Sequence, residues 1–136
     1  MGMAEGEATV HIVDDDAGVR DSLALLLGLK GFRTATHNSA EAFISDFRGG
    51  PGCLLLDIRM PGIGGLELQR LLTDREVRIP VIIITAHGDV AAARTALKAG
   101  AVDFLEKPLD HDLLVATVRE ALARDAETRA TSARQR

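Results

Sequence analysis

Short apolar runs, most of them followed at once by a polar residue, recur along this chain and restrict its possible folds more than any other feature. Four runs have the length of a strand: residues 9–13, 53–56, 81–84 and 102–105. Residues 33–36 give a weaker strand prediction. Continuous apolar runs of this length are typical of strands buried on both faces of a parallel sheet.

Stretches with helical spacing of apolar residues separate these runs. One such stripe contains Val19, Leu23 and Leu27, and a later one contains Leu68 and Leu72. Residues suited to helix N-caps precede several of the helical stretches, and they are Asp16, Ser39, Asp89 and Asp110. About five β-α units result, which is the pattern of an α/β protein with a doubly wound, five-stranded parallel sheet and about five helices.

The composition fits one cytoplasmic domain. The chain has 136 residues, of which 46% are hydrophobic and 3% aromatic, enough for an aliphatic core. Its net charge of −4 argues against direct nucleic-acid binding. No apolar stretch approaches the roughly 20 residues that a membrane span needs. The start of the chain carries Glu5 and Glu7 and does not resemble a secretion signal. The lone Cys53 cannot form an internal disulfide.

The folded domain is expected over residues 8–123. Residues 1–7 are expected to form a flexible N-terminus. Residues 124–136 contain Ala, Thr, Ser, Arg and Gln but no large apolar side chain, so we expect a frayed helix end or the start of an interdomain linker outside the core.

Polar side chains follow four of the predicted strands. The Asp14-Asp15 pair, Asp57, Thr85 and Lys107 come at or just after the carboxyl ends of successive strands. In parallel α/β sheets these ends lie together at the edge where ligands bind. Three neighbouring carboxylates repel one another unless a cation joins them, and hard oxygen ligands suit Mg²⁺. A carboxylate can also accept a phosphoryl group, which Lys107 and Thr85 would contact.

Each of these residues also has a plainer interpretation. An acid after a strand often caps the next helix, and Asp16 is expected to be such a cap. Alone, Asp57 would more often be a turn residue, Thr85 a strand-end hydroxyl and Lys107 a solvated side chain. Their order along the chain, all at strand ends, favours a common site.

The chain resembles the receiver domain of two-component response regulators, which has the CheY-like fold. The matching motifs are Val13-Asp14-Asp15-Asp16, residues 56–62, Thr85-Ala86, residues 100–105 and Lys107-Pro108. The resemblance covers roughly residues 9–122. Residues 57–62, 87–90 and 98–108 further resemble the FixJ branch, whose members usually carry a C-terminal DNA-binding domain. This resemblance implies the flavodoxin-like strand order 2-1-3-4-5.

The resemblance also implies roles for individual residues. Asp57 would accept a phosphoryl group from a histidine kinase, with Thr85 and Lys107 beside it. Asp14, Asp15, Asp57 and the backbone carbonyl of Arg59 would hold Mg²⁺.

A switch pair and a special peptide bond follow from the same resemblance. Thr85 and Phe104 would form the pair that moves on phosphorylation, although an aromatic residue in a buried strand is also simply a core residue. The Lys107-Pro108 peptide bond would be cis. The face formed by the fourth helix, fifth strand and fifth helix would then dock a partner or a second copy. Kinase specificity would lie on the first helix near Val19, Ser22 and Leu23.

Several alternative functions differ in their output or in the chemistry of the site. The chain could be part of a transcriptional regulator, contacting DNA only through an output domain absent here, or a stand-alone receiver that acts by protein contact. A Mg²⁺-dependent phosphohydrolase of the haloacid-dehalogenase type needs an acid two residues after its nucleophile, where this chain has Arg59. A receiver that binds partners without phosphorylation would not need the complete set of site residues. The sequence thus favours a signalling switch over an enzyme.

Other polar residues have less definite interpretations. Arg59 and His87 lie two residues after Asp57 and Thr85, where they could control water access to a phosphoryl group or be ordinary loop side chains. His11, His37 and His111 show no metal-ligand spacing with one another or with a cysteine, so a zinc site is not expected.

Overall fold

The computed structural model describes residues 8–134, so the predicted flexible segment 1–7 lies outside the described residues. Five strands form one sheet, and they are β1 (Thr9–Val13), β2 (Arg33–His37), β3 (Gly52–Asp57), β4 (Val81–Thr85) and β5 (Asp103–Glu106). Five helices accompany them, and they are α2 (Ala17–Leu29), α3 (Ala40–Asp46), α4 (Gly65–Asp74), α5 (Val90–Lys98) and α6 (His111–Arg134).

The strands are parallel and lie in the order β2-β1-β3-β4-β5, which confirms the predicted doubly wound topology. The register brings the carboxyl ends of the strands level with one another. Val13 at the end of β1 pairs with Leu56, and the next residue of β3, Asp57, pairs with Ile84. Polar residues at or just after these ends therefore meet at one edge of the sheet.

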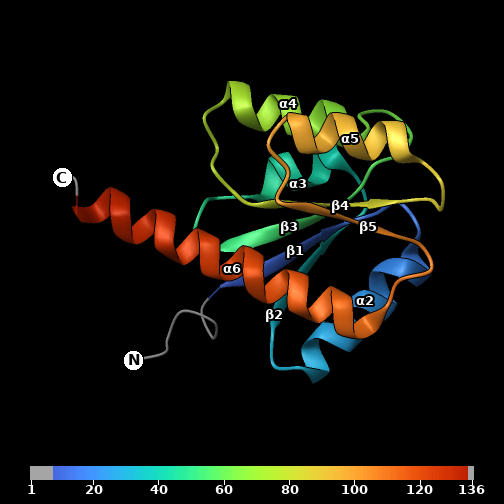
Figure 1. Ribbon diagram of the computed structural model, residues 1–136, viewed down its shortest axis with the longest axis horizontal. Helices are drawn as coiled ribbons and strands as arrows, with labels where there is room; N and C mark the ends of the chain where they lie inside the picture. Colours follow the sequence, from blue (N-terminus) through green and yellow to red (C-terminus); the bar gives the residue numbers. More distant parts are fainter. Residues whose placement is uncertain (1–7, 135–136) are drawn as a thin grey trace.

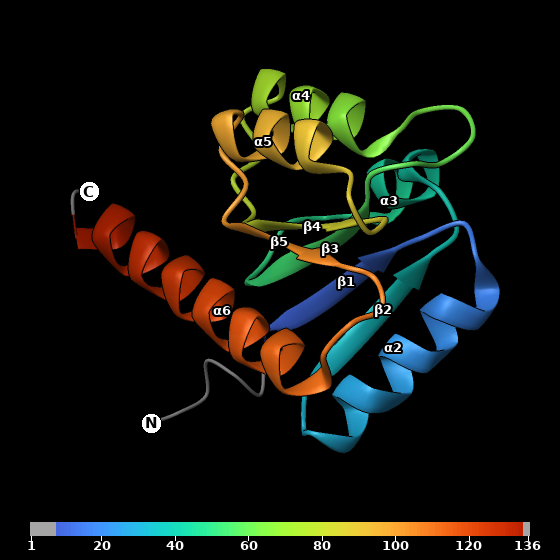
Figure 2. The same cartoon turned by 45° about the vertical axis from the view of Figure 1, so that its right-hand side comes forward.

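Both faces of the sheet are covered by helices, as Figures 1 and 2 show: α2 and α6 lie on one face, and α3, α4 and α5 on the other. Side chains of β3 alternate between the two resulting cores. Cys53 and Leu55 pack with the first pair of helices, and Leu54 and Leu56 pack with the second group. This double burial explains why the run at residues 53–56 is apolar without interruption.

Three of the four predicted N-caps hydrogen-bond the first turn of their helix. Asp16 accepts from the backbone N–H groups of Gly18 and Val19 at the start of α2. Ser39 caps α3, and Asp110 accepts from a backbone N–H in the first turn of α6. Asp89 stands at the N-cap position of α5, but its side chain makes no capping bond.

Helix α6 continues well beyond the expected end of the folded domain. It runs unbroken to Arg134 and projects past the amino edge of the sheet (Figure 2). Asp125 is only 4% exposed, so this part of the chain is not simply a frayed end. Its carboxylate accepts hydrogen bonds from the backbone N–H of Gly52 at 3.0 Å and from Arg129 Nε at 2.9 Å. Long-range polar contacts therefore attach the helix to the start of β3.

Candidate functional site

Three acidic side chains gather at the carboxyl edge of the sheet. Asp14 directly follows β1, Asp57 ends β3, and Asp15 begins the turn into α2. One carboxylate oxygen from each lies within 4.8 Å of the others. Asp14 and Asp57 are buried, whereas Asp15 is exposed, so the cluster is open to solvent on one side. The predicted acidic cluster is thus assembled by two segments that are distant in sequence, Asp14-Asp15 after β1 and Asp57 at the end of β3.

Lys107 and Thr85 complete the predicted group. The Nζ atom of Lys107 lies 3.9 Å from Asp14 Oδ2, too far for a hydrogen bond but close enough for attraction between charges. That buried oxygen has no hydrogen-bond partner among the described residues. The Thr85 hydroxyl is fully buried and likewise has no partner within residues 8–134. Buried polar atoms without partners call for an explanation, and a group bound at this edge of the sheet would supply one.

The electrostatic setting makes Asp57 a difficult place for a negative charge. Burial, and then the charge of Asp14, raise the pKa of the Asp57 carboxyl to about 6. The ammonium group of Lys107 and the backbone N–H of Arg59, which donates to Asp57 Oδ1 at 3.3 Å, oppose that increase. A bound cation would remove most of the repulsion.

The loop after β3 fits tightly over the end of the strand. A Cβ atom on Gly65 would lie 2.8 Å from the backbone oxygen of Asp57 and 2.8 Å from Cα of Ile58. Glycine therefore lets the start of α4 approach the strand, and the Gly65 N–H donates to the Ile58 carbonyl at 3.0 Å. This contact fixes the turn that presents Asp57.

The remaining predicted residues lie around this group. Phe104 is half-buried and packs against the core under α3, α4 and α5. The Lys107-Pro108 peptide bond is cis. Arg59 and His87 have mostly exposed side chains that contact acids, with Arg59 paired to Asp89 and His87 Nδ1 3.6 Å from Glu106.

Two features were not expected from the sequence. Asp89 pairs with Arg59, 30 residues away, and no local pattern indicates this contact. His11 and His37 meet across β1 and β2, with Nδ1 of His11 3.2 Å from Nε2 of His37. Burial, and then the charge of His37, lower the pKa of His11 to about 4. The pair packs with Phe43 and Phe47 and is therefore part of an aromatic cluster.

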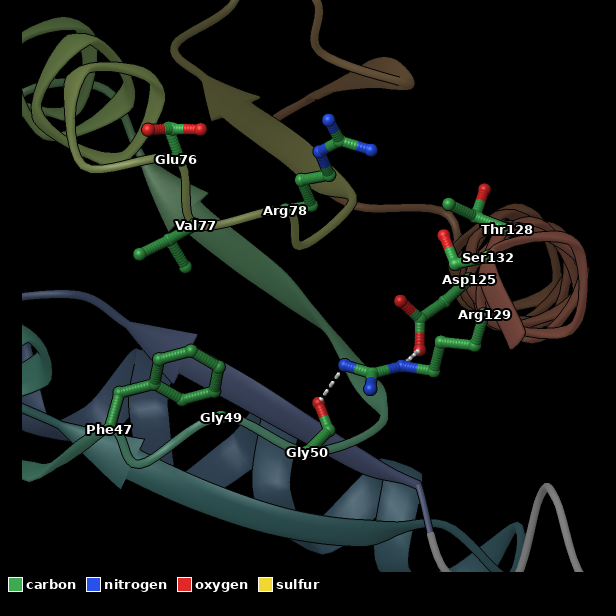
Figure 3. A pocket seen from close by; sticks show the side chains of 10 residues that line it. All are labelled: Phe47, Gly49, Gly50, Glu76, Val77, Arg78, Asp125, Thr128, Arg129 and Ser132. Carbon is green, nitrogen blue, oxygen red and sulfur yellow. Dashed lines mark hydrogen bonds and ion pairs between the residues drawn. The ribbon is translucent and has the colours of Figure 1, made fainter. Parts of the chain in front are cut away.

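Clefts lie at both edges of the sheet. One of about 740 Å³ adjoins the acidic group, between α2 and the segment Lys107 to Leu109. Another of about 580 Å³ lies at the opposite edge, beside Asp125 and Arg129 of α6 (Figure 3). Of these two clefts, the one at the carboxyl edge is lined by a residue of the predicted site, Lys107. No helix within residues 8–134 is long and apolar enough to cross a membrane.

Comparison with known proteins gives a consistent family. Residues 10–119 match the model of the response regulator receiver domain. The chain is 50% identical over 121 residues to the transcriptional regulatory protein FixJ of Azorhizobium caulinodans and 49% identical over 116 residues to FixJ of Rhizobium meliloti. These alignments cover 87% and 83% of this chain but 56% of each relative. The chain therefore spans little more than half the length of these relatives.

Solved structures agree with this comparison. The response regulator StyR superposes with a TM-score of 0.90 at 42% identity, over 95% of this chain and 66% of that one. The structure titled FixJ-N superposes with a TM-score of 0.79 at 48% identity, over 86% of this chain and 94% of that one. The chain belongs to the receiver domain family of two-component response regulators, in its FixJ-type branch.

Proposed function

We propose that this chain is a phosphorylation-controlled switch in which Asp57 accepts a phosphoryl group from a histidine kinase. The observation that carries the proposal is the placement of Asp57 within one cluster with Asp14 and Asp15, with the cation of Lys107 3.9 Å from Asp14. Thr85, whose hydroxyl has no partner among the described residues, follows Ile84, the residue that pairs with Asp57. In the transfer, a carboxylate oxygen of Asp57 forms a bond to phosphorus while the bond between phosphorus and the donor histidine nitrogen breaks.

A divalent cation fits the acidic cluster. Asp14, Asp15 and Asp57, together with the backbone carbonyl of Arg59, would hold Mg²⁺. The buried, unpaired oxygen of Asp14 supports this assignment because a carboxylate oxygen without a donor suits a hard cation. When bound, Mg²⁺ supplies neutralisation of the charge carried by the transferring phosphoryl group.

Lys107 and Thr85 would act on the phosphorylated form. The ammonium group of Lys107 pairs with a phosphoryl oxygen as a point charge. The Thr85 hydroxyl, which has no partner in this structure, donates a hydrogen bond to another oxygen. Movement of Thr85 toward the phosphoryl group leaves space that Phe104, now half-buried, fills. Phosphorylation would thereby favour one of two existing conformations.

Two surfaces suit the partners of such a switch. The cleft between α2 and Lys107 is lined by Val19, Ser22 and Leu23, where a kinase would dock. The face formed by α5, β5 and α6 exposes Val90, Leu97 and Leu113. Exposed apolar side chains there suit a second copy or an output domain.

Dimerisation on phosphorylation would double the mass measured by light scattering. A phosphorylated protein that stays monomeric at high concentration would contradict dimerisation.

The output is proposed to be control of transcription through a DNA-binding domain beyond this segment. Support comes from the relatives, which are named transcriptional regulators and are nearly twice as long as the aligned region. A receiver acting alone by protein contact is the second candidate, and the exposed apolar residues of the α5-β5-α6 face favour it equally.

Intact-mass spectrometry after incubation with acetyl phosphate and Mg²⁺ tests the central step. The wild-type chain is expected to gain ~80 Da, one phosphoryl group. Asp57→Ala should gain nothing, while the matched change Asp46→Ala, at an exposed acid on α3, should leave the gain intact. An equal gain in Asp57→Ala would place the acceptor elsewhere. No gain in folded wild type would favour a receiver that works by binding alone.

A further inference from the structure

Asp89 occupies the N-cap position of α5 without capping it. Its carboxylate oxygen Oδ2 instead receives both Nε and Nη2 of Arg59, at 2.9 and 2.8 Å. The cap residues Asp16 and Ser39 have extended backbones, and their side chains accept hydrogen bonds from the first turn of their helices. Asp89 has φ −83° and ψ 62°, and its side chain makes no such bond. Residue type is therefore not the reason, because Asp16 is also an aspartate.

The start of α5 lacks the partner that Asp89 would supply. The N–H groups in the first turn of a helix have no intrahelical acceptor, and a carboxylate at the N-cap is the preferred group to satisfy them. No side-chain cap bond is present at this terminus. Capping requires the extended backbone seen at Asp16 and a turn of the carboxylate toward Ala91 and Ala92. Asp89 therefore has two competing partners, Arg59 and its own helix.

Arg59 connects this choice to the phosphoacceptor. Its backbone N–H donates to Asp57 Oδ1 at 3.3 Å, and its side chain is 73% exposed, so the guanidinium is free to turn. A phosphoryl group on Asp57 would add a charge of about −1.5 to −2, and guanidinium pairs with phosphate in preference to a single carboxylate oxygen. The Arg59 side of this ion pair is exposed although the Asp89 side chain is only 16% exposed. Exposure of the guanidinium weakens the pair toward the strength of a helix cap, so a competitor for Arg59 changes the balance.

We propose that Asp89 is a two-position switch that couples the loop after Asp57 to helix α5. With Arg59 paired to Asp89, α5 is uncapped. When a phosphoryl group draws Arg59 away, Asp89 turns to cap α5 and stabilises its first turn. This inference rests on the proposed phosphorylation of Asp57 for its trigger, but the competition between Arg59 and α5 exists without it.

Helix α5 is well suited to respond. Only Ala93 and Ala96 are buried along its length, and Val90 and Leu97 are exposed. Short side chains give it little packing energy. The same loop is held on its other side by Glu106, whose Oε2 accepts from the Gly88 N–H at 3.0 Å. A cap that forms or breaks next to this fixed point therefore acts mainly on the first turn of α5.

Amide hydrogen exchange of residues 91–94, followed by NMR in the unphosphorylated protein, tests the competition directly. Arg59→Gln should free Asp89 and slow exchange roughly five-fold. The double variant Arg59→Gln with Asp89→Ala should lose that slowing, and Asp89→Ala alone should change little. Arg48→Gln, at another exposed arginine, serves as the matched control. The proposal would be overturned if amides 91–94 exchanged faster in Asp89→Ala than in wild type, or if Arg59→Gln did not slow their exchange.

A second arm tests the trigger. After phosphorylation by acetyl phosphate and Mg²⁺, wild type should show the same slowing at residues 91–94, and Asp89→Ala should not. If mass spectrometry shows phosphorylation but exchange there is unchanged, the coupling is wrong. If no phosphoryl group is taken up, the proposed function fails instead, and the unphosphorylated variants still decide whether Asp89 has two positions.

Discussion

At the scale of single residues, Asp57 carries a charge where the fold disfavours one. It is 7% exposed and next to the buried Asp14, and the two effects together raise its pKa to about 6. A carboxyl whose folded-state pKa lies above its unfolded value costs stability once it ionises. Such a cost is typical of clustered carboxylates in functional sites, and this cluster is compatible with metal binding.

Asp57→Asn should therefore stabilise the protein when divalent cations are absent. Because the pKa is raised, the destabilising charge is present above about pH 6 and disappears toward the unfolded value of about 3.8. We expect the free energy of unfolding to increase by about 2 kcal/mol at pH 7.5, and by clearly less at pH 5. Urea titration in EDTA measures it, with the exposed acid variant Asp21→Asn as the control. An unchanged or lower stability of Asp57→Asn at pH 7.5 would contradict this explanation.

At the scale of elements, the sequence was most informative where burial is continuous. Continuous apolar runs predicted β3 and β4 best, because both strands are buried at every position. The prediction for β2 was weaker because that strand has exposed positions. The acidic cluster was predictable too: parallel strands bring their carboxyl ends together, so Asp14 and Asp57 lie close once the strands are placed. Local capping patterns were correct at three helices.

The sequence was least informative where polar residues have distant partners. Asp89 matches an N-cap pattern, yet Arg59 holds its carboxylate. The second half of α6 has the composition of a linker, yet Asp125 is buried. Its carboxylate binds the backbone N–H of Gly52, which lies 73 residues earlier in the chain. Neither contact leaves a periodic signal, so a pattern of apolar spacing cannot reveal it.

Asp125→Ala should lower the free energy of unfolding because it removes the contact with Gly52. The change removes the acceptor for the buried Gly52 N–H and the partner of Arg129. An unsatisfied buried donor costs about 1–3 kcal/mol, so we expect a loss of roughly 2 kcal/mol in urea unfolding followed by circular dichroism. Glu120→Ala on the same helix breaks an exposed pair with Arg124 and should cost under about 0.5 kcal/mol. Equal effects of the two changes would show that Asp125 is not a buried anchor.

At the scale of the whole molecule, the two edges of the sheet carry different groups of polar contacts. The carboxyl edge holds the acidic cluster and the loop to α5. The amino edge holds the contact between α6 and the segment Gly50–Gly52, where Arg129 Nη2 donates to the Gly50 carbonyl (Figure 3). Because β3 joins Gly52 to Asp57, one buried strand connects both edges. The extension of α6 is therefore attached to the start of β3 by polar contacts.

Shortening α6 tests whether its extension belongs to the domain. A chain ending at residue 123 keeps the region that matches the receiver family but loses Asp125 and Arg129. We expect it to fold with the same sheet and to lose about 1–2 kcal/mol in stability, since water reaches the freed Gly52 N–H once the helix is gone. A chain ending at residue 131 retains both anchors and should match the intact chain. Urea unfolding gives the stabilities, and phosphoryl uptake at Asp57 should be preserved in both because the site lies at the other edge. Equal stability of all three chains would mean that Asp125 and Arg129 do not stabilise the domain, and the contacts of α6 with Gly50 and Gly52 would then carry no structural role.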